Sequence, residues 1–445
     1  MATEAKFDPS RQNPFVSNLS VQISIDQRNM ILIQSQHIKE CFFVEDIFSH
    51  CIIGKLVFID VESLFEAGPF TGNEIISLIY GVEETREIVF DIWKVTNIIQ
   101  ASPTHSTDEA LIELIFVDTT FYNMFVTKNS FSFAAETPYT DMVKYMLINM
   151  VGWSSGDINL EPCSNFFTDS IALPYWTTSE SIDFLLKRAK SKTTNKSGYL
   201  VYNSTEDQWK VNVKTMDYLF SKANVLDKDS YIFEDSNANI QGQNKIYEWW
   251  IEGINKNTMD AARGGIWKGF NPKEKKFLTN TYTYKDGIND LIAVGSKSLY
   301  SDISDANSFH RIVAENTPED LQNVTYDTWV KNYNIQQQVN IILPGNEKRF
   351  CGMQIEVEWP SMQRHEFTNK GVSFQKQMRG KYLIQSITHN FVGLSTGSNI
   401  NYTQRIKLLK NAFHESDAAT LLNIPSKNQN MGGGTNKKEV VLLKQ

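Results

Sequence analysis

Cysteine is scarce in this 445-residue sequence: the four residues, Cys41, Cys51, Cys163 and Cys351, are dispersed along the chain. A disulfide framework needs more cysteines in a shorter chain, so we expect reduced, mostly buried thiols. No apolar run reaches the roughly 18 residues of a membrane span, and the start of the sequence mixes charges with prolines. We therefore expect neither a membrane-spanning helix nor a signal peptide, and a soluble protein made in a cytoplasm.

Basic residues are outnumbered by acidic ones. The chain has 43 Lys and Arg against 51 Asp and Glu, a formal net charge of −8. The basic side chains are mostly scattered and form no long run that would neutralise nucleic-acid phosphates. The sequence therefore argues against tight binding of nucleic acid.

The remaining composition is that of an ordered globular protein, with 41% hydrophobic and 21% charged residues. Segments that alternate apolar and polar residues with period two are frequent, as expected for strands with one buried face. The clearest are VQISID at 21–26, WKVNV at 209–213 and MQIEVEW at 353–359. The sequence therefore predicts a chain dominated by strands, and its length suggests two to four domains.

Two segments between the earlier and later strand groups are predicted to be helices. In the segment 137–152, apolar residues follow helical spacing, Pro138 suits the start and Gly152 the end. In the second helix, Thr177 and Glu180 have the spacing of a capping box. Residues 198–213 then indicate a hairpin, since two strand patterns flank a polar turn.

The rest of the chain is less regular. Residues 251–329 have several glycines and mixed periodicity, which we interpret as an irregular insertion with a possible helix at 287–299. From about His414 the periodicity is lost, and a glycine run at 432–434 precedes an apolar tip at 440–443. We expect this end to be an arm that orders against a partner subunit.

Two serines lie in GxSxG patterns, Ser154 and Ser395. A nucleophile elbow needs a strand-to-helix turn, followed in the chain by an acid and then a histidine. Ser154 instead follows a predicted helix, and Ser395 lies between predicted strands with His414 ahead of Asp417. We favour turn residues over nucleophiles at both positions.

Three other motifs are weak candidates for chemistry. Lys268 in a glycine-rich stretch is followed by glycine, where a phosphate-binding loop needs Ser or Thr. Glu83 and Glu84 could act as acid and base, but adjacent acids at an exposed strand end are common. Residues 302–307 carry oxygen ligands but lack the glycine and trailing glutamate of a calcium loop. We favour a structural reading for each.

His37, Cys41, His50 and Cys51 form the tightest potential metal cluster, because thiolate and imidazole are the usual zinc ligands. Their spacing matches no zinc module, and both cysteines adjoin apolar residues. Buried core thiols are the favoured interpretation, with zinc as the alternative.

His389 lies in the apolar phase of its strand, which favours a hydrogen-bonded structural histidine over a ligand or base. The adjacent Trp249 and Trp250 could stack on carbohydrate, but aromatic residues serve equally in packing at subunit contacts, which we favour. The sequence thus predicts no catalytic, cofactor-binding or metal-binding residue, and no cofactor.

The order of the segments is distinctive. NEIISLIYG, EIVFDIWKVTNII and ALIELIFVDTTFYNMF precede a helix opened by SFAAETPYTDMVKYML, and a block from IALPYW to KVNV follows. GGIWKGFNPKEKKFLTNTYTY comes next, and GKYLIQSITHNF with NYTQRIKLLKNAF follows later. Over residues 20–415 this order resembles the central hub proteins of contractile phage-tail baseplates, a family shared with the N-terminal hub portion of type VI secretion spike proteins.

The resemblance implies a mainly β (α+β) fold with two β-barrel-like domains. The expected division is a first barrel at 1–136, a helical connector at 137–197, a second barrel at 198–250 and 330–412, an irregular insertion at 251–329 and a C-terminal arm at 413–445.

The resemblance also implies a non-enzymatic subunit of a homotrimeric, pseudo-sixfold ring that joins a hexameric tail tube to a trimeric central spike. The implied partners are the spike, tail-tube or tube-initiator proteins and other baseplate subunits, with DNA passing through without specific binding and no membrane insertion. The implied location is the virion tail baseplate, after assembly in the host bacterial cytoplasm. A tail-associated cell-wall or polysaccharide hydrolase and a carbohydrate-binding receptor remain the alternatives.

Overall fold

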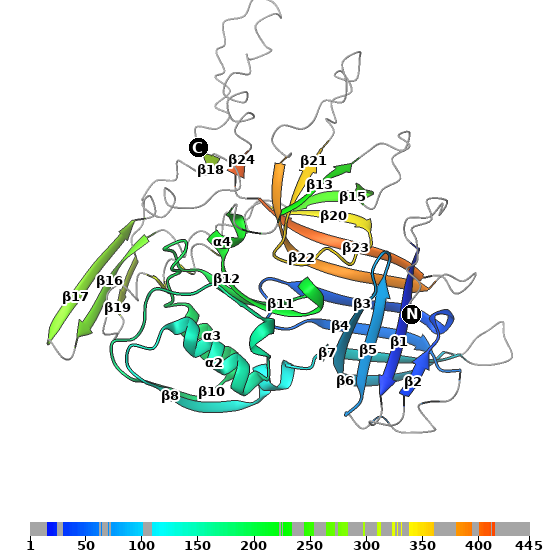
Figure 1. Ribbon diagram of the computed structural model, residues 1–445, viewed down its shortest axis with the longest axis horizontal. Helices are drawn as coiled ribbons and strands as arrows, with labels where there is room; N and C mark the ends of the chain where they lie inside the picture. Colours follow the sequence, from blue (N-terminus) through cyan, green and yellow to red (C-terminus); the bar gives the residue numbers. More distant parts are fainter. Residues whose placement is uncertain are drawn as a thin grey trace, which may run out of the picture.

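Strands dominate the structure (Figure 1). The computed structural model describes residues 16–24, 30–61, 64, 70, 73–100, 109–221, 224, 226–233, 244–252, 264–271, 275–283, 297–298, 309–312, 323–324, 327, 331, 338–359, 380–393, 400–410 and 412–413. The predicted mainly β fold class is confirmed. Across these residues, no helix has the length and apolar character needed to cross a lipid bilayer.

Eight strands close into a first barrel. In ring order they are β1 (Val16–Ser24), β5 (Ile75–Gly81), β6 (Arg86–Gln100), β7 (Glu109–Asp118), β4 (Ile53–Ile59), β3 (Ile38–Asp46), β22 (Gly380–Gly393) and β23 (Ile400–Leu409). Every neighbouring pair is antiparallel, and the β1–β23 pairing closes the ring. The short β2 (Met30–Ile33) adds to β1, and a 3-10 turn, η1 (Ser35–His37), leads into β3.

The period-two alternation of these strands fills the first barrel with apolar side chains. Val21, Phe43, Leu56 and Phe90 are fully buried in one cluster. A Cβ atom at Gly54 would lie 2.2 Å from the ring of Phe116, so the strand needs glycine there to make room for the ring. The two residue types thus fit each other inside the barrel.

A second, smaller ring of strands uses the other ends of β22 and β23. Its remaining members are β20 (Gln338–Pro344), β15 (Glu248–Glu252), β14 (Lys245–Ile246), β13 (Leu226–Phe233) and β21 (Gln354–Glu358). The ring closes because β14 pairs with β13, and β15, which follows after one residue, pairs with β20. Ile341, Trp359, Tyr382 and Ile406 are fully buried in its core.

The two barrels therefore share two strands, which run between them in Figure 1. The first residues of β22 pair with β21 of the second barrel, and residues 386–392 pair with β3 of the first. Its pairing with β23 shifts register between Ile384 and Ser386, a bulge of the kind that bends a strand. The bulge lies at the passage from one barrel to the other.

A connector unit packs beside the barrels. It contains the helices η2 (Tyr122–Val126), α2 (Tyr139–Met146), η3 (Leu147–Val151), η4 (Ser155–Asp157), α3 (Thr178–Leu186), η5 (Glu206–Gln208) and α4 (Met216–Phe220), and the strands β8 (Lys128–Phe133), β9 (Ile158–Leu160), β10 (Ile171–Thr177), β11 (Tyr199–Ser204) and β12 (Lys210–Thr215). Both predicted helices are confirmed. Thr177 and Glu180 form the predicted capping box, and Gly152 follows η3 with a φ of +99°.

The strand pairing differs from the expected domain grouping at the hairpin. β11 and β12 form the predicted hairpin, but they pair with β9 of the connector and not with the second barrel. The first barrel, in turn, takes β22 and β23 from the far end of the sequence. Local alternation predicts a strand but does not identify the strands that it pairs with. The other boundaries stay a prediction.

The segment expected to be irregular contains a regular sheet. β16 (Gly264–Asn271) pairs with β17 (Lys276–Thr283) and β19 (Phe309–Ile312), which corrects the prediction for these residues. β18 (Lys297–Ser298) is a strand paired with β24 (Ala412–Phe413), so the end of the expected helix is also wrong. Residues 287–296 and 299 of the expected helix, and the arm beyond Phe413, lie outside the described residues.

Candidate functional site at the joint between the barrels

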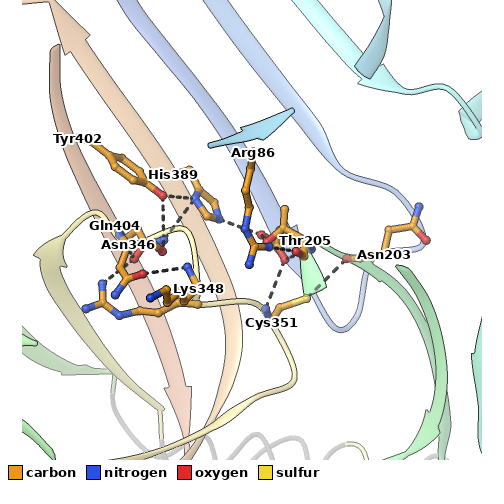
Figure 2. Close-up of polar contacts among 11 residues, drawn as sticks. Arg86, Asn203, Thr205, Asn346, Lys348, Cys351, His389, Tyr402 and Gln404 are labelled. Atoms are coloured by element: carbon orange, nitrogen blue, oxygen red, sulfur yellow. Dashed lines mark hydrogen bonds and ion pairs between the residues drawn. The ribbon is translucent and has the colours of Figure 1, made fainter. Parts of the chain in front are cut away.

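A buried carboxylate lies where the two barrels and the connector meet. Glu45 of β3 is fully buried, and its carboxylate accepts a hydrogen bond from His389 Nε2 at 2.9 Å. The backbone N–H and hydroxyl of Thr205 in the connector donate to it at 3.0 and 2.8 Å, and the backbone N–H of Cys351 donates at 3.4 Å. One side chain on β3 thus contacts the connector, the second barrel and the shared strand β22, through Thr205, Cys351 and His389, which are labelled in Figure 2.

From His389 the polar network continues into the second barrel. The other imidazole nitrogen lies 2.8 Å from the Tyr402 hydroxyl, and Gln404 Nε2 donates to the same hydroxyl at 3.1 Å. Arg349 Nη1 donates to Gln404 Oε1 at 2.7 Å, and Arg349 Nε donates to the Tyr231 hydroxyl at 3.1 Å. All five side chains are buried, so the hydrogen bonds satisfy polar groups that would otherwise be costly inside the protein.

The loop between β20 and β21, residues 345–353, supplies three of these contacts through Cys351 and Arg349, and it is called the joint loop. Its Glu347, 1% exposed, accepts backbone N–H groups from the turn between β5 and β6 at 2.7 to 3.0 Å. Its Lys348 forms ion pairs with Glu83 at 2.8 Å and Glu84 at 3.7 Å. The joint loop therefore clamps a turn of the first barrel through both backbone and side chains.

A second buried carboxylate ties the first barrel to the connector. Asp118, at the end of β7, accepts the backbone N–H and hydroxyl of Thr120 at 2.8 and 2.7 Å, and the amide of Asn203 from β11. Burial raises the pKa of Asp118 to about 6, against the lowering effect of these hydrogen bonds.

The Glu45–His389 pair has the groups of an acid–base dyad but no access to a substrate. Both side chains have zero exposed area, and the His389 ring stacks on Phe43 with centroids 4.3 Å apart. General acid–base catalysis requires a reacting group within hydrogen-bond reach. What this arrangement does is fix the relative position of two barrels and a connector.

A chain of serine, histidine and aspartate lies at the edge of the connector. His50 Nδ1 is 2.9 Å from the hydroxyl of Ser179 on α3, and His50 Nε2 is 3.4 Å from Asp183 one turn later. In serine hydrolases the acid holds Nδ1 and the serine faces Nε2, so the nitrogens are exchanged here. Ser179 is also only 8% exposed. The arrangement fastens α3 to the connection between β3 and β4.

The potential metal cluster is divided by the fold. Cys41 is buried inside the first barrel, whereas Cys51 belongs to the core of the connector. His37 lies on η1 beside Gln36, and His50 binds Ser179. All four cysteines are buried, as predicted for core thiols, and none forms a disulfide. In the part of the chain that the structure describes, no three His, Cys, Asp or Glu side chains are grouped to hold a metal ion.

The other sequence candidates lie apart from one another. Ser154 is exposed between η3 and η4, and Lys268 lies inside β16 and not at the start of a helix. Ser395 and residues 302–307 lie outside the described residues. Trp249 packs on Trp359 in the second barrel with ring centroids 4.8 Å apart.

The tryptophan pair does not form one stacking platform. Trp249 pairs across the sheet with the buried Ile341, while Trp250 pairs with Asn340 and lies under the guanidinium of Arg405 at 4.6 Å. Adjacent strand residues point to opposite faces.

The prediction of a hydrogen-bonded structural His389 is confirmed.

The sequence did not predict the residues of the joint, although it contained one signal for them. Glu45 continues the buried phase of Cys41 and Phe43 on β3, as His389 does on β22. A charged residue in the apolar phase of a strand requires a buried partner. That signal could have paired Glu45 with His389, but it could not have identified Thr205 or Arg349, whose segments have no such phase.

Comparison with known proteins gives a likeness of fold. No protein-family model matches the sequence, nor does any curated protein. Among solved structures, the tail protein from Neisseria meningitidis MC58 is similar with a TM-score of 0.54 at 9% identity, over 90% of this chain and 99% of that one. The 43 kDa tail protein of prophage MuSo2 from Shewanella oneidensis is similar with a TM-score of 0.50 at 9% identity, over 88% and 98%.

At these identities the likeness concerns the fold. This chain shares the fold of two tail proteins over nearly their whole length, as the shares of the aligned chains indicate. The resemblance expected from the order of the segments is confirmed at this level.

Proposed function

We propose that this chain is a structural hub subunit of a phage-tail baseplate, in which three copies form a ring with pseudo-sixfold symmetry. The observation that carries the proposal is the pair of closed barrels that share β22 and β23. Three such pairs present six barrels around one axis, a number that matches a sixfold tube on one face while the chain itself repeats three times. The fold likeness to two tail proteins supports a place in a tail.

The buried joint supports this role for a physical reason. A pseudo-sixfold ring needs a fixed angle between the two barrels of each copy, because a deviation of this angle would be repeated in all three copies. Glu45, Glu347 and Arg349 hold that angle through buried, charge-assisted hydrogen bonds, which are stronger than neutral ones. The proposed partners are a central spike on the threefold face, and tail-tube or tube-initiator proteins and other baseplate subunits elsewhere.

The proposal is tested by mass and symmetry. Light scattering of the purified chain at micromolar concentration should give three times the monomer mass of 50.9 kDa. Class averages by electron microscopy should show a ring with six lobes. A monodisperse monomer at these concentrations, or a ring with another number of lobes, would exclude the proposed symmetry.

The second candidate function is a tail-associated cell-wall or polysaccharide hydrolase, which would rest on the contact of His50 with both Ser179 and Asp183, although the two imidazole nitrogens are exchanged relative to a serine hydrolase. Purified protein incubated with peptidoglycan distinguishes the two proposals. The structural proposal expects no turnover by the wild-type chain. Turnover that disappears in Ser179→Ala and persists in the exposed-serine control Ser154→Ala would favour the hydrolase instead.

A further inference from the structure

Each barrel has one strand that lies diametrically opposite the joint. In the eight-strand ring, β6 is four strands away from β22 in either direction. In the smaller ring, counting β14 and β15 as one strand, β15 is three strands away from β22 in either direction. The outer faces of β6 and β15 are therefore the two ends of the barrel pair, and Figure 1 shows them on opposite sides of the shared strands.

The β6 end exposes large apolar side chains. Trp93 is 46% exposed and Val89 39% exposed, and Ile75 on the neighbouring β5 is 41% exposed. The Trp93 ring lies 5.0 Å from Phe121 and 5.3 Å from Tyr122, which is itself 40% exposed. Contact between the rings holds them in place, so little side-chain entropy remains to be lost on binding.

The β15 end presents a different set of groups. Trp250 lies on the outer face, with the Arg405 guanidinium 4.6 Å from its ring centroid. Glu248 is exposed and lies two residues before Trp250, in the same phase of the strand. Tyr247, just before β15, is 41% exposed, whereas Ile251 pairs with the buried Val339 and so does not belong to this face. Trp, Tyr and Arg are the residue types that dominate binding energy at protein interfaces.

Each end carries an exposed charge close to its tryptophan, and these two charges have opposite sign. The exposed Lys94 follows Trp93 on β6, and the exposed Glu248 lies two residues before Trp250 on β15. A ring of identical copies needs a heterologous contact, in which one surface of each copy meets a different surface of the next. Two unlike faces at opposite ends of the chain meet that requirement, whereas a twofold dimer would need one self-complementary face.

We propose that the occupant of each face is a second copy of this chain, the β6 face of one copy packing on the β15 face of the next. This inference rests on the proposed ring and specifies how it closes. Trp93 and Trp250 are the apolar anchors, and Lys94 pairs with the partner's Glu248. Each barrel then has a neighbour on both sides, one through the shared strands and one across the subunit contact.

The test uses the full chain with one face changed at a time. Trp93→Glu and Trp250→Glu should each elute as monomers with unchanged circular dichroism, because either change removes one of the two faces. Tyr175→Glu is the matched control: Tyr175 on β10 of the connector is 69% exposed and belongs to neither face, so this variant should remain a trimer.

Mixing the two tryptophan variants distinguishes a heterologous contact from a contact between like faces. Each variant retains the face that the other lacks, so an equimolar mixture should give a dimer with one intact contact, although neither variant associates alone. If like faces met, one of the two variants would still associate by itself. That outcome, or trimers of both variants, would overturn the inference.

A charge swap gives a second measurement that does not depend on the tryptophans. Lys94→Glu should raise the concentration for half-dissociation by about fivefold, as expected for an exposed ion pair, and adding Glu248→Lys should restore it. If the double variant dissociates at the same concentration as Lys94→Glu alone, the pairing of Lys94 with Glu248 is contradicted. A wild-type chain that is monomeric would instead refute the proposed ring itself, so the two failures are distinguishable.

Discussion

At the scale of single residues, the joint depends on charged side chains at strand positions where the period-two pattern predicts apolar ones. Glu45 has no exposed area, yet it accepts hydrogen bonds from three different parts of the chain. Removing one member of a buried, hydrogen-bonded network leaves the others unsatisfied, which costs more than the pair contributes when intact. The joint should therefore be sensitive to single substitutions that are harmless elsewhere on the same strand.

Glu45→Ala should lower the free energy of unfolding by about 3–5 kcal/mol, the usual cost of leaving a buried charge network without one partner. Glu40→Ala is the control, because Glu40 lies on the same strand and is only partly buried. It should change stability by about 0.5 kcal/mol or less. Chemical denaturation of both variants measures the difference. Equal values for the two would mean that the network does not stabilise the joint.

Asp118 should make stability depend on pH. Its folded pKa of about 6 lies above its ordinary value of 3.8, so the folded state binds the proton more tightly. Stability is then greatest below about pH 4 and falls as the pH rises to 6, by at most about 3 kcal/mol for this group.

Asp118→Asn should remove this dependence. In the described part of the chain, Asn203 Oδ1 has no hydrogen-bond partner, so rotation of that amide lets it accept from the new side chain. The control is Asp141→Asn, because Asp141 on α2 is exposed and lies outside the joint. Melting temperatures of the wild type and both variants, measured from pH 4 to 7, check the prediction. A slope that persists in Asp118→Asn would assign the titration to another group.

At the scale of elements, β22 and β23 are the ones that decide the architecture. The sequence predicted both strands from their β-branched and aromatic residues, as it predicted α3 from its capping box and the hairpin from its polar turn. Each of these signals is local. The partners of a strand are not, since Phe391 pairs with Cys41, far away in the sequence. The elements were therefore predictable, while the sharing of two strands by two barrels was not.

The joint loop should tolerate no side chain at its first residue. A Cβ atom at Gly345 would lie 1.9 Å from the ring of Tyr402, which is fully buried and hydrogen-bonded to His389. Gly345→Ala should destabilise the protein by at least the roughly 1–3 kcal/mol typical of overpacking. Gly156→Ala is the matched control, because no atom lies within 4 Å of its added methyl group. Similar melting temperatures for the two variants would contradict the contact.

At the scale of the whole molecule, net charge bears on what passes through the proposed ring. Each chain carries a formal charge of −8, and a wall that bound phosphates would retain DNA by counterion release. We expect a neutral to acidic channel. The purified assembly should therefore not shift duplex DNA in a gel at physiological salt. Retention that weakens steeply as salt is raised would indicate a basic lining and contradict this expectation.

The sharing of β22 and β23 also sets the order of events during synthesis. The first barrel cannot close when its N-terminal strands leave the ribosome, because two of its eight strands, β22 and β23, are still untranslated. Cys41 pairs with Phe391, which is synthesised 350 residues later. At a translation rate of about 5–20 residues per second, this is a delay of roughly 20 to 70 seconds. During that interval β3, and the start of β1 that β2 leaves uncovered, present unpaired edges of the kind that pair with other chains. Neither barrel can close before β22 and β23 have been made, so both barrels are completed late in synthesis.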